Sequence, residues 1–441
     1  MEIVKLKEMS KEYYEKMRYR SSRDILKEEV FADIKKIGDI IQAKGDEGVV
    51  EVTRDFDKVN LSVNELRVKE REFTEAVNKL DKRVIDAIEV SIKNHWKYNE
   101  KLLPPKISLY ELDNGIVGGR KVSPLNRVGL YVPCGKGSYP SSFITIAVPA
   151  VIAGVKDIDI IVPPKPDGSV DSAVLAAAQI LGLKNIYRAN GVAGVLAAAF
   201  GTEKMPKVDK IVGPGGEYIM AAQMYAQLQG VSVALFFGPS ECMIIADDTA
   251  DSRLIAADLI NEAEHGMNSS AILITDSEAL ALKVQKEIPV QLSQLPEWRR
   301  KYAESAMKTY GGIILVENMD QAVDLANEWG NEHIQVATKD PWSIVHKIDS
   351  ASEILVTQWT PFSAISYCIG VPACLPTGQF ARIYSGVTVD TFLKFCAVTE
   401  LKREGLEKLK ETIKNLSQYE EFPAHTQSIF IRESSDMLER K

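Results

Sequence analysis

Apolar side chains in the first hundred residues recur at the spacing of helices. In residues 23–43 and 70–99, apolar positions return every three or four residues between charged ones, which is the pattern of amphipathic helices. Neither segment carries a motif with evident chemistry. The N-terminal part is therefore predicted to be helical.

From residue 127 the pattern changes to short runs rich in β-branched residues. Alanine-rich stretches of helical spacing, such as 174–181 and 192–200, separate the runs RVGLYV, DIDIIV, KNIYRA, KIVG, VSVALFF and CMIIAD. A second series alternates helices at 252–264, 277–286 and 321–329 with the runs SSAILIT, GGIILVE, HIQVAT and SEILVT. Such alternation is typical of βα units with parallel strands. It predicts an α/β fold with two domains.

The pattern changes again after Val387. Leu406, Leu409, Ile413 and Leu416 form one apolar stripe before the sequence EEFPAH. A stripe of this kind is the buried face of an amphipathic helix. The tail is therefore predicted to be a small helical appendage.

Composition restricts the class of protein. The 441 residues are 45% hydrophobic and 26% charged, with a formal net charge of -8, which indicates a globular chain of two or more units. Lys and Arg are scattered, so a nucleic-acid partner is disfavoured and a small molecule is favoured. No signal peptide and no membrane-spanning apolar run is present, so a cytoplasmic location is expected. The five cysteines have no C-x-x-C spacing, which indicates buried thiols.

Two glycine-rich turns follow predicted strands. They read PCGKGS at 133–138 and GPGGEY at 213–218, and backbone N–H groups at such a turn and helix start can hold a phosphate. The dinucleotide fingerprint G-x-G-x-x-G is absent, so tight connections are the favoured interpretation and a nicotinamide cofactor does not follow from the turns. A third turn, FGPSE at 237–241, presents Ser240.

Two of the histidine settings suggest chemistry. In NEAEHG, Glu262 and His265 lie three apart, on one helix face, and with His425 they would offer zinc two imidazoles and a carboxylate. An ordinary hydrogen-bonded pair is the alternative, and spacing alone favours it. Glu332 and His333 are adjacent at a strand start, so they can act together in acid/base catalysis only if they lie in the loop ahead of the strand. A surface pair at a strand edge is the alternative.

Several motifs together resemble the histidinol dehydrogenase family. The resemblance runs from about residue 125 to 432, with a further match at 45–57, and its segments are GDEGVVEVTRDFD, RVGLYVP, AFGTEKMPKVDKIVGPG, GPSE, IIAD, AEHG, NEHI, LPT, FPAH and FIR. The resemblance implies two incomplete Rossmann-like domains with a helical N-terminal and a small C-terminal extension, in a homodimer whose sites borrow residues from the partner's C-terminal segment. The implied domain bounds are 1–25, 26–128 with 245–386, 129–244, and 387–441.

The resemblance also implies oxidation of a primary alcohol through the aldehyde to the carboxylate, with reduction of two NAD. His333 would accept protons in the hydride-transfer steps, and Glu332 would activate water. His265 and His425 match zinc ligands, whereas the family's glutamine and aspartate ligands are replaced by residues 262 and 366, a glutamate and a serine. Zinc with altered geometry and loss of the metal are the two expectations.

The substrate and cofactor positions are matched in part. Ser240 and Glu420 match family residues that bind substrate, but Ala373 stands where the family has a histidine. In the cofactor site, Tyr131 matches, whereas the family's glutamine and asparagine become Ala193 and Gly216. Nucleotide binding is then expected to rest more on backbone groups or on other side chains, with the choice between NAD and NADP open.

Three hypotheses for function follow. The losses at 366 and 373 favour NAD-dependent oxidation of a small polar primary alcohol other than histidinol, because a site without those groups holds an imidazole poorly. A hydroxylated sulfonate is one candidate, since sulfopropanediol dehydrogenases also resemble this family. The alternatives are an authentic histidinol dehydrogenase and a binding protein of the same fold whose catalytic site has decayed.

Overall fold

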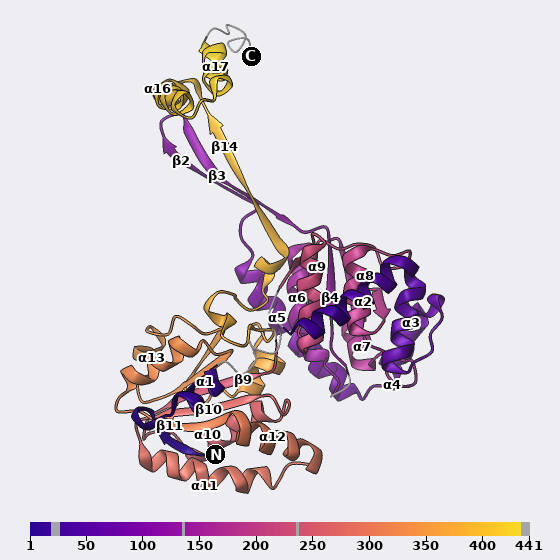
Figure 1. Ribbon diagram of the computed structural model, residues 1–441, viewed down its shortest axis with the longest axis vertical. Helices are drawn as coiled ribbons and strands as arrows, with labels where there is room; N and C mark the ends of the chain where they lie inside the picture. The colour runs from indigo at the N-terminus through magenta and orange to yellow at the C-terminus, as the bar shows by residue number, and fades with distance from the viewer. Residues whose placement is uncertain (19–26, 135–136, 235–237, 434–441) are drawn as a thin grey trace. The chain divides into compact units, whose positions relative to one another are not determined.

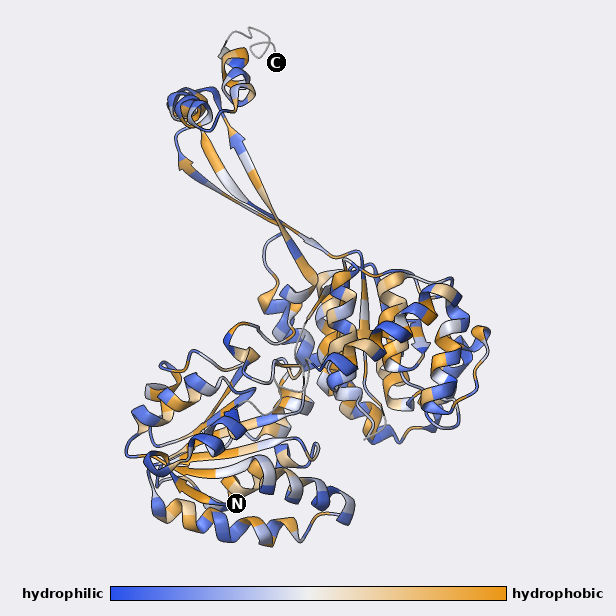
Figure 2. Ribbon diagram, in the orientation of Figure 1, coloured by the Kyte–Doolittle hydropathy of each residue, from blue (hydrophilic) through white to orange (hydrophobic). Residues whose placement is uncertain are grey.

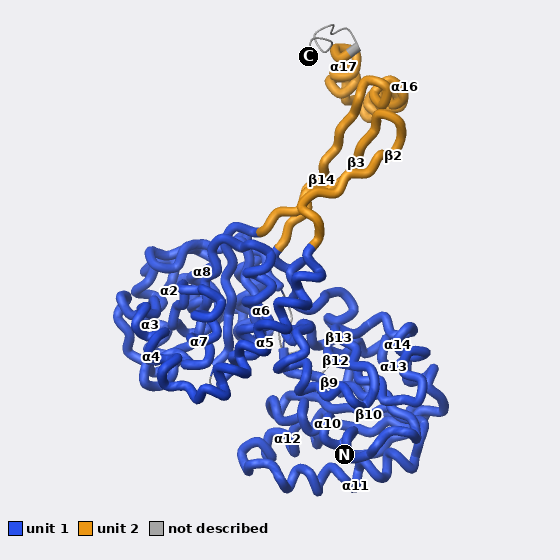
Figure 3. Tube along the Cα trace, turned by 180° about the vertical axis from the view of Figure 1, so that it is seen from behind, with its two compact units in different colours: residues 1–103, 125–392 blue, residues 104–124, 393–441 orange. Residues whose placement is uncertain are grey.

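The computed structural model describes residues 1–18, 27–134, 137–234 and 238–433. Contacts divide the chain into two compact units (Figures 1 and 3). Unit 1 comprises Met1–Leu103 and Leu125–Phe392, and unit 2 comprises Pro104–Pro124 and Leu393–Lys441. Unit 1 holds both parallel sheets, so the predicted α/β class is confirmed.

The first parallel sheet of unit 1 has five strands in the order β6-β5-β4-β7-β8. Its strands are β4 Arg127–Tyr131, β5 Asp157–Val162, β6 Asn185–Arg188, β7 Lys210–Val212 and β8 Ser232–Val233. The connecting helices are α6 Pro140–Ala153, α7 Ser172–Ile180, α8 Gly191–Phe200 and α9 Glu217–Leu228. The strands β4, β5 and β6 are buried almost throughout, which explains why they are continuous apolar runs in the sequence.

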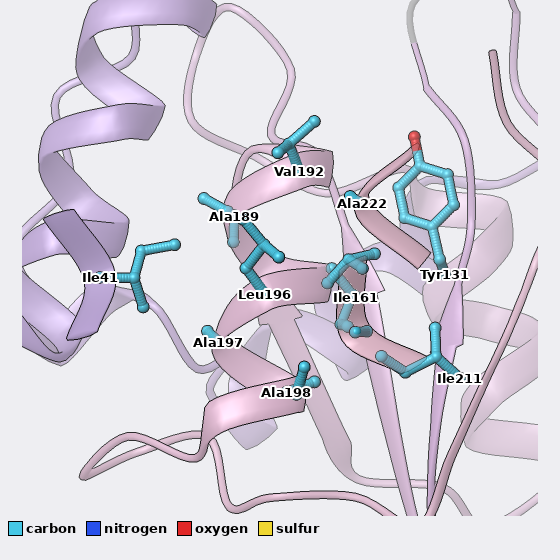
Figure 4. Packing of buried hydrophobic residues seen from close by; sticks show 14 of the residues in the cluster. Ile41, Tyr131, Ile161, Ala189, Val192, Leu196, Ala197, Ala198, Ile211 and Ala222 are labelled. Atoms are coloured by element: carbon cyan, nitrogen blue, oxygen red, sulfur yellow. The ribbon is translucent and has the colours of Figure 1, made fainter. Parts of the chain in front are cut away.

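The predicted N-terminal helices cover this five-stranded sheet. They are α2 Glu28–Lys44, α3 Asp46–Asp57, α4 Glu70–Lys79 and α5 Lys82–Leu102, and they pack on α6, α7, α8 and α9. Figure 4 shows Ile41 of α2 facing the helix that carries Leu196 and Ala197. Residues 70–99 form two helices because Asp81 caps α5 by accepting a hydrogen bond from the Arg83 N–H.

The resemblance implied that residues 26–128 group with 245–386. In the structure α2 to α4 pack on the helices of the five-stranded sheet, whereas α5 packs both on α6 and α7 and on residues 365–369. Residues 104–124 belong to unit 2. The physical reason is that an amphipathic helix shows which face it buries but not which partner covers that face.

The second parallel sheet of unit 1 has six strands in the order β1-β11-β10-β9-β12-β13. Its strands are β1 Ile3–Lys5, β9 Glu241–Ala246, β10 Ser270–Thr275, β11 Gly311–Leu315, β12 His333–Ala337 and β13 Glu353–Val356. Its helices are α1 Lys11–Arg18, α10 Ser252–Ala263, α11 Glu278–Leu292, α12 Glu297–Tyr310, α13 Met319–Trp329 and α14 Pro341–Val345. Figure 2 shows orange along its strands and both blue and orange on the surrounding helices. The predicted alternation is confirmed, and β1, α1, α12 and α14 are additions to it.

Unit 2 is a three-stranded antiparallel sheet with two helices. Its strands are β2 Ile107–Asp113, β3 Ile116–Pro124 and β14 Leu393–Leu401, in the order β14-β3-β2, and its helices are α16 Arg403–Tyr419 and α17 Pro423–Glu433. The prediction of a purely helical tail from residue 387 was therefore wrong for β14. That strand is mostly exposed on both faces, so it has no hydrophobic alternation to reveal it. Among the described residues of the chain, no helix is long and apolar enough to cross a membrane.

Candidate active site

A cavity of about 630 Å³ lies in unit 1, at the carboxyl edge of the five-stranded sheet. The strand order of that sheet reverses beside β4. The chain runs from β4 to β5 and β6 on one side, and then continues to β7 and β8 on the other side. Loops that leave such a point diverge and open a crevice for ligands. The described parts of both glycine turns line the cavity, at Pro133, Gly137, Ser138, Pro214, Gly215 and Gly216.

The turn at 213–216 requires glycine for close approach. A Cβ on Gly213, whose φ is 152°, would lie 2.1 Å from the Tyr131 carbonyl oxygen, and one on Gly215 would lie 2.4 Å from the Ile219 Cβ. A Cβ on Gly216 would meet nothing within 4 Å. The turn is thus tight on its inner side and open on the cavity side, where α9 begins. Unpaired N–H groups and the helix dipole favour an anion there.

The six-stranded sheet meets the cavity at its amino edge. Glu332 lines the cavity from the bend just ahead of β12, and it is 6% exposed. Its Oε2 accepts a hydrogen bond of 2.9 Å from the Glu241 backbone N–H. His333 is the first residue of β12, and its Nε2 lies 3.6 Å from Glu332 Oε1. Neighbouring residues within a strand point to opposite faces, but Glu332 precedes the strand, so its side chain can lie beside that of His333.

The Nδ1 side of the His333 ring contacts a residue that the sequence did not indicate. Its Nδ1 lies 2.9 Å from Oε2 of Glu353, on the adjacent strand β13. Its ring packs edge-on against Phe362, with 5.5 Å between the ring centroids. His333 and Glu353 are partners in the parallel register. Only the pairing of β12 with β13 brings them together, so a motif search could not have identified Glu353.

The surroundings change the proton affinities of the pair. Burial raises the pKa of Glu332 to about 8. Burial alone would lower the pKa of His333, but the carboxyl groups of Glu332, Glu353 and Glu262 outweigh it and raise that pKa to about 9. Titratable groups in a cavity with such perturbed pKa values are typical of acid/base catalysis.

The candidate metal ligands are distributed over both units. Glu262 and His265 lie at the end of α10, with 4.0 Å between Oε2 and Nε2, and Glu262 also accepts a hydrogen bond from Asn261. Ser366 lines the cavity and donates to the Phe362 carbonyl at 3.3 Å. His425 is exposed on α17 in unit 2.

These donors do not form a complete metal site. In the part of the chain that the structure describes, no three His, Cys, Asp or Glu residues are grouped to hold a metal. A catalytic zinc needs about three protein ligands, and unit 1 supplies Glu262 and His265. No chemical step is therefore assigned to zinc.

The remaining candidate positions are placed as follows. Ser240 and Ala373 line the cavity, as does Gly216, and Glu420 is exposed at the end of α16 in unit 2.

Two of the expected cofactor positions are buried instead. Tyr131 is 6% exposed, and burial raises the pKa of its hydroxyl. Ala193 is fully buried in the apolar cluster around α8, and its N–H donates to the Asn190 cap. In this structure Ala193 therefore offers no surface to a cofactor, because it packs in the core.

A positively charged side chain that the sequence did not indicate also lines the cavity. Arg299 is the one Lys or Arg among the described lining residues. It donates to the Glu264 carbonyl at 3.1 Å and lies 4.1 Å from the Trp298 ring centroid. It sits on α12, a helix that carries no recognisable motif, so no sequence signal pointed to it.

Known proteins match the chain along nearly its whole length. The family model described as histidinol dehydrogenase matches residues 20–433. A histidinol dehydrogenase of Synechocystis sp. is 41% identical over 99% of each chain, and a histidinol dehydrogenase homolog of Colwellia psychrerythraea is 36% identical over 100% of this chain and 99% of its own. The crystal structure of histidinol dehydrogenase from Elizabethkingia anophelis superposes with a TM-score of 0.92 at 30% identity and covers 98% of each chain. The chain therefore belongs to the histidinol dehydrogenase family and is an NAD-dependent dehydrogenase.

Proposed function

We propose that this protein oxidises L-histidinol with NAD, through the aldehyde to the carboxylate. The observation that carries the proposal is the buried carboxyl of Glu332 on the cavity wall with the imidazole of His333 beside it. The relatives named histidinol dehydrogenase support this substrate better than the other alcohols that the sequence favoured.

The residues of the cavity fit a dinucleotide. The turn at 213–216 offers open backbone at Gly216, and the first turn of α9 offers N–H donors to a phosphate. The chemistry that bound NAD would supply is hydride acceptance, with one NAD for the alcohol carbon and a second for the same carbon at the hydrated aldehyde stage. Residue 216 is a glycine and has no side chain, so binding of the dinucleotide there depends on backbone groups.

The chain's own residues must handle the protons. Oxidation of the alcohol releases the hydroxyl proton. At the aldehyde stage a water molecule adds to the carbonyl carbon and loses a proton. Glu332 lines the cavity, and we assign it the proton of that water. His333 lies behind it with Nε2 toward Glu332, and we assign it the proton of the alcohol. A pKa held above the ordinary range makes each group an effective proton acceptor once it is deprotonated.

Oxidation of another small polar alcohol is the second candidate. It is favoured by Ser366 and Ala373, which present a hydroxyl and a methyl group to the cavity. Neither side chain can supply the charge or the ring nitrogen that a carboxylate and a histidine would offer to an imidazole substrate. A smaller polar substrate would leave fewer groups unpaired.

We also propose a homodimer, in which Glu262 and His265 of one chain and His425 from the C-terminal segment of the other hold zinc. The dimer is supported by large apolar side chains that unit 2 exposes, among them Tyr110, Leu112, Leu416 and Tyr419. Large apolar side chains that a unit leaves exposed are typical of an interface with another chain. The zinc proposal is supported by the donor chemistry alone.

The test is NADH formation, followed by absorbance, with L-histidinol and with a panel of small polar primary alcohols. Each substrate is assayed with and without added zinc, using the wild type, Glu332→Gln and the exposed control Glu317→Gln. Turnover of histidinol that Glu332→Gln abolishes supports the first candidate. Turnover restricted to another alcohol selects the second. If no alcohol supports reduction, both are contradicted and the decayed binding protein is favoured.

A further inference from the structure

The strongest unassigned feature of the site is the contact between His333 and Glu353. The Glu353 carboxylate lies 2.9 Å from Nδ1 of the imidazole, and the two side chains are 10% and 7% exposed. The Glu353 backbone N–H donates to the Glu332 carbonyl at 3.0 Å. Since His333 and Glu353 are register partners on parallel strands, their side chains point to the same face.

We propose that Glu353 is a positioning residue for His333, whose Nδ1–H donates to the carboxylate and leaves Nε2 as the proton acceptor on the side of Glu332. The inference rests on the proposed function, because it gives His333 the proton of the substrate. A neutral imidazole carries hydrogen on one nitrogen and a lone pair on the other. An acceptor fixed at Nδ1 therefore decides which nitrogen is free to react.

The same contact stabilises the ring after it accepts a proton. The imidazolium lies between two carboxyl groups, 2.9 Å from Glu353 and 3.6 Å from Glu332. A hydrogen bond between an imidazolium and a carboxylate is about twice as strong as a neutral one. A carboxylate in this position holds the ring orientation and favours proton uptake, which is the logic of a catalytic triad.

Other groups face this pair, but none of them makes a described hydrogen bond to Nδ1. The Phe362 ring packs on the imidazole, and Glu262 of α10 raises the pKa of His333 and Glu332. The further titratable neighbours are Tyr98 of α5, which faces Glu353, and Glu241, Cys242 and Cys374, which lie around His333 and Glu332. Among the described residues, Glu353 is thus the group that determines the state of Nδ1.

The first test reads the tautomer without requiring turnover, at a pH of about 10, because the ring is neutral only above its raised pKa of about 9. The chain has five histidines, so selective ¹⁵N-histidine labelling gives a small set of side-chain signals, and His333→Gln identifies the one of interest. We expect a protonated Nδ1 in the wild type with a far-downfield proton. That proton should move upfield in Glu353→Gln and disappear in Glu353→Ala, while Glu317→Gln leaves it unchanged. An unprotonated Nδ1 in the wild type, or an unaltered signal in Glu353→Ala, overturns the proposal.

The second test separates positioning from structure by kinetics. Glu353→Ala should lower kcat by about 10²-fold or more, the range of general-base catalysis, while KM for the alcohol changes by less than about twofold. Glu353→Gln, which keeps the shape and an acceptor oxygen, should recover part of the loss. An unchanged kcat, or a rise in KM alone, contradicts the proposal.

The two variants also cover failure of the fold. If Glu353→Ala does not fold, the isosteric Glu353→Gln decides both tests. If the wild type oxidises no alcohol, the proposed function fails, and the nitrogen spectrum alone decides whether Glu353 sets the tautomer.

Discussion

Replacing the buried carboxyl of Glu332 by an amide should abolish activity and at the same time flatten the pH dependence of stability. Glu332→Gln keeps the side-chain oxygen that accepts the Glu241 N–H at 2.9 Å, so the local fold is retained. It removes the group that accepts protons at the cavity wall, and loss of a general base lowers kcat by about 10²-fold to 10⁴-fold.

The stability effect follows from the direction of the pKa change. Burial raises the pKa of Glu332 from 4.5 to about 8. A group whose pKa is higher in the folded state stabilises the fold fully below its unfolded pKa, and this contribution is lost as the pH rises through the folded pKa. Each tenfold change in proton affinity is worth about 1.4 kcal/mol, so the interval from 4.5 to about 8 corresponds to at most several kcal/mol. The amide does not ionise and lacks this dependence.

The assay is the thermal midpoint at a series of pH values from 5 to about 9, with NADH formation measured on the same preparations. The midpoint of the wild type should fall as the pH rises, and His333 adds to the fall because its pKa is also raised. The difference between Glu332→Gln and the wild type should grow in favour of the variant. Parallel curves for the two proteins, or an unchanged kcat in the variant, would refute the reasoning.

Three further predictions concern the scaffold and the metal. Asn190→Ala removes the side chain that caps α8 and should cost about 1 kcal/mol, measured as faster hydrogen exchange in residues 191–200. Gly194→Ala would place a Cβ 2.4 Å from the Ile161 Cγ2 and should lower stability by about 1 to 3 kcal/mol, measured by urea unfolding; an unchanged midpoint would contradict the packing of α8 on β5. Ser366→Asp adds a carboxylate on the cavity wall and should raise the zinc retained after dialysis, measured by metal analysis. Ser363→Asp, which also lines the cavity, is the control, and equal retention in both would contradict a site at 366.

The sequence by itself determined the parallel α/β class of the protein. Its central strands are buried on both faces, so they stand out as continuous apolar runs between helices. It also indicated Glu332 and His333, because a glutamate directly before a histidine can be recognised from the sequence alone. The two glycine turns follow predicted strands and line the cavity, although the sequence alone favoured tight connections for them.

The tertiary structure alone decided what surrounds those residues. Glu353 and His333 are 20 residues apart in sequence and meet only because β13 pairs with β12 in one register. The burial of Ala193 depends on which helices pack on α8. The strand β14 is mostly exposed on both faces, so its sequence shows no alternation of apolar and polar residues. Local patterns report how a segment divides its own polar and apolar sides. Which segment lies across from it is settled by long-range packing, and that packing determines the contacts of the site.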